Sequence, residues 1–276
     1  MIFCHHTPDF PLARFVEFFW FYEDFYPSHS LEHVLPDGTF ELVIDLREVP
    51  RKLFDRDNSQ RYASFRRGWV SGAHSKYLVI DALPASSMIG AHFKPGGAAA
   101  FLGLPADALH DQVVGIEAIW GRAARDLRER LLSARLPREK FRFLEEFLLE
   151  LLGRAKSETS RQDGIFWALS HFVTEPQGQT IRGAAEAIGI SHKHFVDQFR
   201  KQVGITPKLF CRIHRFQQVL SKVNSGSSIE WADVACGCGY FDQAHFIHDF
   251  KAFAGLNPSS FLVHNRKDPK FLPIDG

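Results

Sequence analysis

The chain has 276 residues, with 33 Lys or Arg against 32 Asp or Glu and a net charge of +1. This length predicts two domains, and a hydrophobic content of 45% is sufficient for two buried cores. We expect no membrane span and a cytoplasmic location, because the sequence opens on no secretory signal pattern and has no apolar run of about 18 residues.

Residues 1–110 are rich in short extended segments separated by turn sequences such as Pro36-Asp-Gly38. The segment Thr39–Leu46 alternates apolar and polar residues, which predicts a strand with one buried face. Several strands without intervening helices favour an antiparallel β-barrel-like domain. The expected strands are Phe15–Phe25, Leu31–Leu35, Thr39–Leu46, Phe65–Val70, Tyr77–Asp81 and Ser87–Phe93.

Aromatic residues are dense in this region, and Phe15–Tyr22 is apolar on both faces. The rings of Trp20, Tyr22 and Trp69 are weak candidates for binding an apolar or aromatic small molecule inside the barrel, and the favoured alternative is that they fill a core. The other face needs a cover, and the candidates are the helix Phe141–Leu152, a second subunit or a ligand. We expect the helix to cover the outside and any effector to bind inside.

The histidines and cysteines show no metal-site spacing, so we expect no metal and no cofactor. His29 and His33 have no second pair nearby, and Cys4-His5-His6 lies at a terminus expected to fray. Cys236-Gly-Cys238 has no partner pair, which favours small core residues. The phrase Lys94-Pro-Gly-Gly97 lacks the phosphate-loop pattern and is interpreted as a strand-to-helix turn.

Residues 111–155 are predicted to be helical, in the segments Gly115–Trp120, Ala123–Leu132 and Phe141–Leu152. They form either a cap packed on the barrel or a dimerisation segment, and we favour packing within the chain. The polar stretch Gly153–Asp163 is the best linker, and Ile165–Phe172 begins the next domain, which we place at residues 161–265. Residues 266–276 are expected to be a tail.

The last hundred residues contain one helix-turn-helix phrase twice, at Ile181–Phe199 and Ile229–Phe250. Each copy has a small Ala that allows close helix packing, a Gly that supplies a positive φ for the turn, and two Phe on one helical face. The opposite face of the second helix is then free to enter a DNA major groove. These residues are Ala185, Gly189, Phe195 and Phe199 in the first copy, and Ala235, Gly239, Phe246 and Phe250 in the second.

Capping residues delimit the two copies. Ser191 stands where an N-cap belongs, and Gly204-Ile-Thr-Pro207 and Gly255-Leu-Asn-Pro258 each end one helix and open the next. Between the copies, Lys208–Val223 is predicted to be one long amphipathic helix. A rigid helix would hold two recognition helices about one DNA turn apart, roughly 34 Å.

This double motif resembles the AraC/XylS family of bacterial transcription regulators over about residues 161–265. The resemblance implies a C-terminal DNA-binding domain with two helix-turn-helix motifs behind a β-barrel sensor domain. The phrases Leu35-Pro-Asp-Gly38, Trp69-Val-Ser-Gly72 and Phe93-x-Pro-Gly-Gly-Ala98 resemble an uncharacterised N-terminal β domain found in a subset of that family. The matching residues are Ala185, Gly189, Ser191, Phe195, Phe199, Gly204 and Pro207, then Gly239, Tyr240, Asp242, Phe246, Phe250, Lys251, Gly255 and Pro258.

Two positions depart from the family pattern, because Asp197 and His248 stand where the family usually has Arg. Asp197 either accepts a hydrogen bond from cytosine N4 or is an exposed carboxylate that bonds locally and touches no DNA. The basic bias is weak, with 13 Lys or Arg against 10 Asp or Glu in residues 161–276, which predicts modest non-specific affinity. The expected DNA contacts are His192, Lys193, Val196, Asp197, Arg200, Lys201 and Lys208, then Gln243, Ala244, Ile247, His248 and Lys251.

The sequence therefore predicts an α+β multidomain, non-enzymatic protein that regulates transcription by sequence-specific DNA binding, modulated by a small molecule in the N-terminal domain. Double-stranded DNA is the expected partner, with RNA polymerase, an effector and a second copy of the chain as further candidates. The alternative is a DNA-repair alkyl transferase or another enzyme fused to a DNA-binding domain. That alternative needs an acceptor cysteine in a zinc cluster or a Pro-Cys-His phrase, and Cys4 has neither context.

Overall fold

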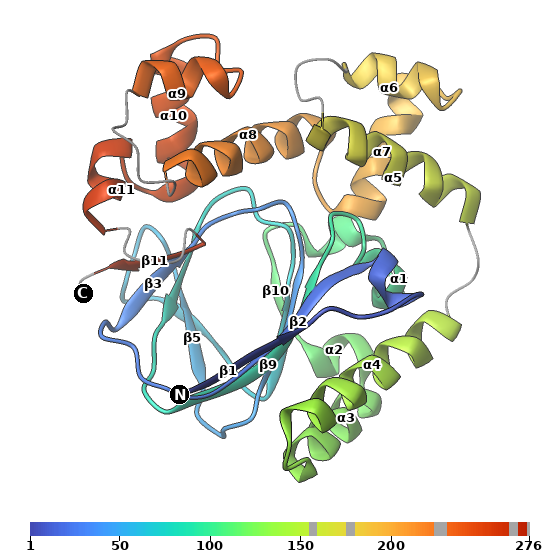
Figure 1. The fold of residues 1–276 in the computed structure, drawn as a ribbon, viewed down its shortest axis with the longest axis vertical. Coiled ribbons are helices and arrows are strands. Elements are labelled where there is room, and N and C mark those ends of the chain that lie inside the picture. The colour runs from blue at the N-terminus through green and yellow to red at the C-terminus, as the bar shows by residue number, and fades with distance from the viewer. Residues whose placement is uncertain (155–158, 175–179, 224–230, 265–269, 275–276) are drawn as a thin grey trace.

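Two antiparallel sheets form the N-terminal part of the chain and face each other in a barrel-like arrangement (Figure 1). The structure is a computed structural model that describes residues 1–154, 159–174, 180–223, 231–264 and 270–274. The six-stranded sheet contains, in spatial order, β1 (Ile2–His6), β2 (Val16–Phe25), β9 (Ser86–Phe93), β4 (Glu41–Asp45), β7 (Gly68–Ser71) and β10 (Val113–Gly115). The five-stranded sheet contains β11 (Phe271–Ile274), β3 (Leu31–Val34), β8 (Leu78–Asp81), β5 (Arg51–Phe54) and β6 (Tyr62–Phe65).

The pairing register aligns Trp20, Gly90, Val43 and Trp69 in one row across the six-stranded sheet. Residues in such a row share one face, because alternate side chains of a strand point to opposite faces. A Cβ on Gly90 would lie 2.3 Å from a ring carbon of Trp20, so the indole crosses the sheet where no side chain obstructs it. We call this the inner face, because it is turned toward the five-stranded sheet.

The outer face of the six-stranded sheet is covered by helices of the middle segment. Phe19 and Phe21 of β2 are fully buried there. The ring of Phe141 in α4 (Pro137–Arg154) stacks on His6 at 5.6 Å, and the Lys140 ammonium lies 5.7 Å from the centre of the Phe21 ring. The other elements beside this sheet are the 3-10 helices η1 (Leu12–Arg14) and η2 (Ala106–Leu109) and the helices α1 (Ala99–Leu102), α2 (Ile116–Trp120) and α3 (Arg122–Ser133).

The C-terminal helices lie together above one end of the two sheets (Figure 1). The long helix α8 runs between two groups of helices, which lie at its opposite ends. These helices are α5 (Thr159–Thr174), α6 (Ile181–Ala187), α7 (His192–Val203), α8 (Pro207–Val223), α9 (Trp231–Gly237), α10 (Gln243–Ala254) and α11 (Pro258–His264). No helix in the described part of the chain is long and apolar enough to cross a membrane.

Three sequence-based expectations need correction. The segment Cys4-His5-His6 does not fray, because it belongs to β1, which pairs with β2 over five residues. The strand within Thr39–Leu46 has both faces covered rather than one, because helices cover its outer side and Asp45 on its other side is fully buried. The expected strand Phe65–Val70 is divided between β6 and β7, and the strands β1, β5, β10 and β11 were not expected at all.

The predicted linker and tail are more structured than their composition indicates. Helix α4 extends to Arg154 and α5 begins at Thr159, so helices occupy both ends of Gly153–Asp163, and only residues 155–158 lie outside the described part. The tail contributes β11, whose Phe271 and Ile274 pair with Val34 and Leu31 of β3. The chain therefore returns to the β domain after its last helix.

Candidate DNA-binding surface and its contacts with the β domain

The first helix-turn-helix unit consists of α6 and α7, and the N-cap of α7 is the residue that the sequence predicts. The Ser191 hydroxyl accepts a hydrogen bond from the His194 N–H at 3.3 Å, at the start of α7. Gly189 has a φ of +74° in the turn, a conformation that Gly adopts without strain. Ala185 is buried against α7, and the Phe195 and Phe199 side chains are fully buried. The predicted orientation of α7 is therefore confirmed.

The second unit, α9 and α10, repeats this construction. Gly239 has a φ of +78°, and the Asp242 carboxylate accepts a hydrogen bond from the His245 N–H at 2.7 Å to cap α10. Phe246 and Phe250 are fully buried. Ile229 and Glu230, with which the second motif begins, lie outside the described residues.

Helix α8 fixes the separation of the two units. Its 17 residues give a length of about 25 Å at 1.5 Å per residue. Phe210, near its start, contacts Phe199 of α7, and Phe216 contacts Phe250 of α10, with ring centres 5.8 Å and 5.3 Å apart. One apolar stripe on α8 therefore holds both recognition helices.

A buried ion pair, which the sequence did not predict, holds α10 on α8. The Arg212 guanidinium donates to both carboxylate oxygens of Asp249, at 2.6 Å and 3.3 Å. The Asp249 side chain is 1% exposed and that of Arg212 is 31% exposed. The hydrogen bonds that Arg212 donates to Asp249 raise the pKa of Arg212 above its usual range. This pair orients the second recognition helix.

The predicted contacts on α7 divide into two groups. His192 and Lys193 are exposed at the start of the helix. Toward its end the charged residues already have partners in the chain. The Lys201 ammonium donates to the Asp197 carboxylate at 2.9 Å, and Arg200 lies 3.2 Å from Asp107 of η2 in the β domain.

These partners bear on the two interpretations of Asp197. Its hydrogen bond with Lys201 lowers the pKa of the Asp197 carboxyl, so the side chain is an ionised member of a local pair. This geometry matches the interpretation of Asp197 as a locally bonded carboxylate. Val196, the predicted contact before it, is half-buried. Lys208, the remaining predicted contact of the first half, is exposed at the start of α8.

On α10 the predicted residues form one exposed face. Gln243 and Lys251 are exposed at its two ends, and the residues between them border a shallow hollow. The hollow is lined by Ala244, Ile247, His248, Lys251 and Ala252. Phe241 was missed, although it is 93% exposed immediately before the cap of α10. An aromatic residue between the turn Gly and the cap Asp is a signal that the sequence contained.

Both recognition helices contact the β domain through the glycine that ends them. A Cβ on Gly204 would lie 2.8 Å from the ring of Phe40, and one on Gly255 would lie 2.7 Å from the ring of Tyr77. These glycines also have φ values of +89° and +75°, so each has two reasons to lack a side chain. The buried His33 ring bonds the Ala254 carbonyl at 3.0 Å beside the second contact. Burial lowers the pKa of His33, which favours its neutral form.

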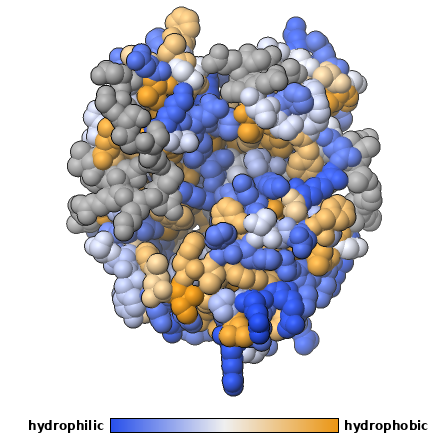
Figure 2. Space-filling view, viewed as in Figure 1, coloured by the Kyte–Doolittle hydropathy of each residue, from blue (hydrophilic) through white to orange (hydrophobic). Residues whose placement is uncertain are grey.

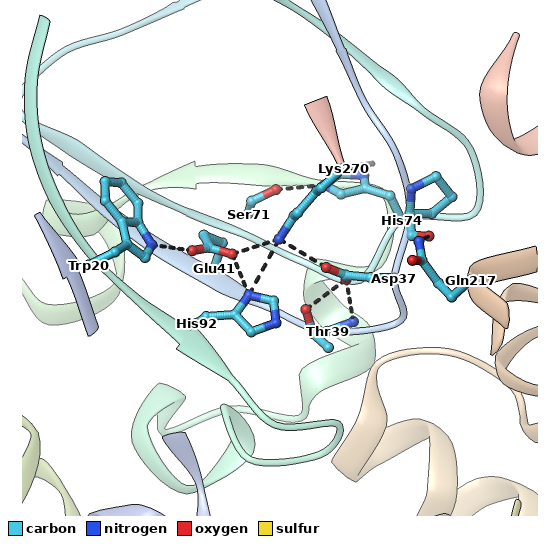
Figure 3. Close-up of polar contacts among 10 residues, drawn as sticks. Trp20, Asp37, Thr39, Glu41, Ser71, His74, His92, Gln217 and Lys270 are labelled. Atoms are coloured by element: carbon cyan, nitrogen blue, oxygen red, sulfur yellow. Dashed lines mark hydrogen bonds and ion pairs between the residues drawn. The ribbon is translucent and has the colours of Figure 1, made fainter. Parts of the chain in front are cut away.

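The inner face of the β domain carries a polar cluster (Figure 3). Lys270, just before β11, places its ammonium 2.9 Å from Asp37 and 2.9 Å from Glu41. His92 bonds the same Glu41 oxygen at 2.7 Å, and the Trp20 indole N–H donates to the other. We call Asp37, Glu41, His92 and Lys270 the inner cluster.

The opposite charges of the inner cluster stabilise one another, while Lys270, 3.3 Å from the His92 ring, opposes the protonation of His92. Burial alone would raise the pKa of Asp37 and Glu41, but the Lys270 ammonium and His92 hold both below their usual range. Burial alone would lower the pKa of Lys270 and His92, but the carboxylates raise both above their usual range. The cluster is therefore ionised, with two negative and two positive charges when His92 is protonated.

The weak effector candidates lie where the sequence analysis expected them. Trp20 and Trp69 belong to one row of the inner face, and the Trp20 ring stacks on Tyr22 at 5.6 Å. Figure 1 shows a gap between the ribbons of the two sheets. In the space-filling view from the same side, side chains cover this gap (Figure 2).

His29 pairs with Glu32 at 2.5 Å. The described residues contain no group of three or more His, Cys, Asp or Glu suited to a metal ion.

Comparison with known proteins finds two family models that match parts of the chain. Residues 4–115 match a domain of unknown function (DUF6597), and residues 184–263 match a helix-turn-helix domain. No curated protein matches the chain. Two capped units on one connecting helix define a double helix-turn-helix protein. The order of its motifs resembles that of AraC-type DNA-binding domains, and the match over residues 184–263 shows a helix-turn-helix domain in this part of the chain.

Two solved structures illustrate the range of structural similarity. The fatty-acid-bound ToxT of Vibrio cholerae aligns with 10% identity and a TM-score of 0.47, over 88% of this chain and 94% of that one. A DNA-binding transcriptional dual regulator of Escherichia coli K-12 aligns with 18% identity and a TM-score of 0.31, over 40% of this chain and 95% of that one.

Proposed function

We propose that the chain is a sequence-specific transcription regulator that inserts α7 and α10 into successive major-groove segments of one DNA duplex. The observation that carries the proposal is the pair of capped units at opposite ends of α8, each with an exposed recognition-helix face (Figure 1). A helix in the major groove reads base edges with the side chains of such a face.

The exposed residues suggest a division between base reading and phosphate binding. Gln243 can form two hydrogen bonds with adenine N6 and N7, and Phe241 and Ile247 are suited to contact with thymine methyl groups. The positive charge for the DNA backbone comes from His192, Lys193, Lys208 and Lys251. Arg200 and Lys201 add to it when they exchange their carboxylate partners for phosphate groups.

The proposal includes modulation by a small molecule bound on the inner face. Because Gly204 and Gly255 place both units against the β domain, a ligand that shifts this domain would shift the recognition helices. Such a ligand changes DNA affinity by the same factor by which DNA changes the affinity for the ligand. RNA polymerase and a second copy of the chain stay predicted partners.

The repair-enzyme alternative gains no support from the structure. Cys4 is a half-buried residue of β1 that pairs with Phe21 of β2. Cys238 is buried in the second unit, and burial raises the pKa of its thiol. A thiol with a raised pKa is a weak nucleophile, because the thiolate is the reactive form.

The test is a DNA affinity measurement on the full chain and two Gln variants. Duplexes selected from a random pool supply the cognate site, and fluorescence anisotropy gives the dissociation constant. Gln243→Ala is expected to weaken cognate binding by about 1–3 kcal/mol and to relax one base position. Gln60→Ala, an exposed residue between β5 and β6, is the matched control and should change nothing. If Gln243→Ala binds the cognate duplex and all single-base variants as the unmodified chain does, the assignment of α10 is wrong.

A further inference from the structure

We propose that Asp37 and Glu41 form a binding site for a primary ammonium group, which Lys270 fills in cis, and that an amine effector binds there by replacing Lys270. This inference deepens the proposed function, because it names the chemical class of the effector and the segment that the effector displaces. It rests on the geometry of the inner cluster and on where the chain goes from it.

The two carboxylates are positioned by groups other than Lys270. The Thr39 hydroxyl and N–H donate to one oxygen of Asp37 at 2.7 Å and 3.0 Å. Glu41 accepts from the Trp20 indole N–H and is bonded by His92. Both carboxylates therefore have donors that stay in place without the tail, and the site is organised before a cation enters it.

The charge balance selects a cation. With His92 protonated and Lys270 present, the inner cluster has two positive and two negative charges. If Lys270 leaves, one net negative charge stays in a site that is largely shielded from water, since the Glu41 and His92 side chains are only 18% and 12% exposed. A buried charge without a partner is costly, so a replacement ligand must bring a positive charge. The indole N–H of Trp20 donates to the Glu41 oxygen that does not face Lys270, so this carboxylate keeps its position when the cation changes.

Lys270 is attached to the β domain by a short segment. Beyond its ammonium, the attachment includes the bond from the Leu35 N–H to the Lys270 carbonyl at 2.9 Å, the pairing of the four-residue β11 with the edge of β3, and the buried Leu272 side chain. Replacement of this lysine by a free amine therefore disturbs one short edge strand and leaves the sheet intact.

The loop Leu35–Phe40 connects this site to the DNA-binding helices. Asp37 bonds Lys270, and the adjacent Pro36 carbonyl accepts a hydrogen bond from Gln217 of α8 at 2.7 Å. Gly38 contacts the ring of Phe210, and Phe40 contacts Gly204. A change of occupant at Asp37 thus acts on a loop whose other side contacts α8 and the end of α7.

The experiment is a rescue of Lys270→Ala with propylammonium chloride, which has the three carbons and the ammonium that this substitution removes. We expect Lys270→Ala to unfold at a lower temperature, and propylammonium to restore most of the lost midpoint in a saturable way. Propan-1-ol at the same concentration and sodium chloride at the same ionic strength are the controls, and neither should have a comparable effect. Lys76→Ala, which removes an exposed lysine, should show no rescue. In Lys270→Ala combined with Glu41→Gln the rescue should be lost.

Three results would overturn the inference: no rescue by propylammonium, equal rescue by propan-1-ol, or rescue that persists with Glu41→Gln. If Lys270→Ala does not fold alone, propylammonium is added during refolding, and recovery of the circular dichroism spectrum is read by the same criteria. DNA binding by the unmodified chain is measured separately. A chain that binds DNA but shows no amine rescue overturns this inference and leaves the proposed function standing.

Discussion

The ion pair between Arg212 and Asp249 gives the sharpest stability prediction. Arg212→Met keeps most of the side-chain stem and removes the guanidinium, so a carboxylate that is 1% exposed loses the cation bonded to both of its oxygens. Asp249→Asn keeps the shape and one acceptor oxygen, and it leaves Arg212, which is 31% exposed, in contact with water. The two substitutions break the same pair with different consequences.

The expected magnitudes follow from this asymmetry. Removing one partner of a buried pair costs about 3–5 kcal/mol when the other charge stays buried, so we expect Arg212→Met to cost roughly 3 kcal/mol. Asp249→Asn should cost less, about 1–2 kcal/mol, because its neutral amide still accepts one hydrogen bond and the arginine stays hydrated. Combining Arg212→Met with Asp249→Leu removes both charges, and the double variant should be more stable than Arg212→Met alone.

Urea denaturation followed by circular dichroism gives the free energy of unfolding of each variant, and anisotropy with cognate DNA reports whether α10 is still oriented. Arg212→Met should lose more stability than Asp249→Asn and should also weaken DNA binding. Equal losses for the two single variants, or a double variant as unstable as Arg212→Met, would contradict the assignment of the buried charge to Asp249.

Three further predictions concern the contacts between domains. Asp107→Asn frees Arg200 for a phosphate, so DNA affinity measured by anisotropy should rise and the slope of log affinity against log salt should steepen by about 0.9; an unchanged slope would refute this. Gly255→Ala should cost about 1–3 kcal/mol more in urea denaturation than Gly103→Ala, which has a similar φ but no atom near its Cβ; equal costs would contradict the close contact. Burial and the Lys270 ammonium lower the pKa of His92, but Glu41 and Asp37 together raise it above 6.5, so the stabilising contribution of protonated His92 is complete below pH 6.5 and lost as the pH rises through the folded-state pKa. The difference in unfolding midpoint between the unmodified chain and His92→Gln should therefore shrink as the pH rises. A difference that grows with pH would contradict a raised pKa for His92.

The C-terminal domain was predictable because its signals are local. Ser191, Asp242 and Asn257 cap helices that begin beside them, and a cap needs only a short side chain within about three residues of the N–H it accepts from. Gly189 and Gly239 supply positive φ angles where the spacing of the motif predicts turns. The exposed face of each recognition helix followed from the buried positions of its Phe pair.

The long-range contacts within and between the domains were not predictable, because they connect residues that are distant in sequence. Lys270 and Glu41 are 229 positions apart, and Arg212 and Asp249 are 37 apart. The strand β11 is four residues long and contains Pro273, which is typical of an edge strand but gives no signal of which strand it joins. Gly204 and Gly255 were correctly interpreted as helix ends, and only the structure adds that each also contacts a ring of the β domain.

The most direct test of the central claim is DNase footprinting on a duplex selected from a random pool by the full chain. Two rigid recognition units at the ends of α8 predict two protected segments on one face of the duplex, with centres about one helical turn or roughly 34 Å apart. Gln243→Ala should weaken protection of one segment and leave the other in place. A chain that selects no sequence above background, or that protects a single segment unaffected by substitutions on α7 and α10, would contradict the account.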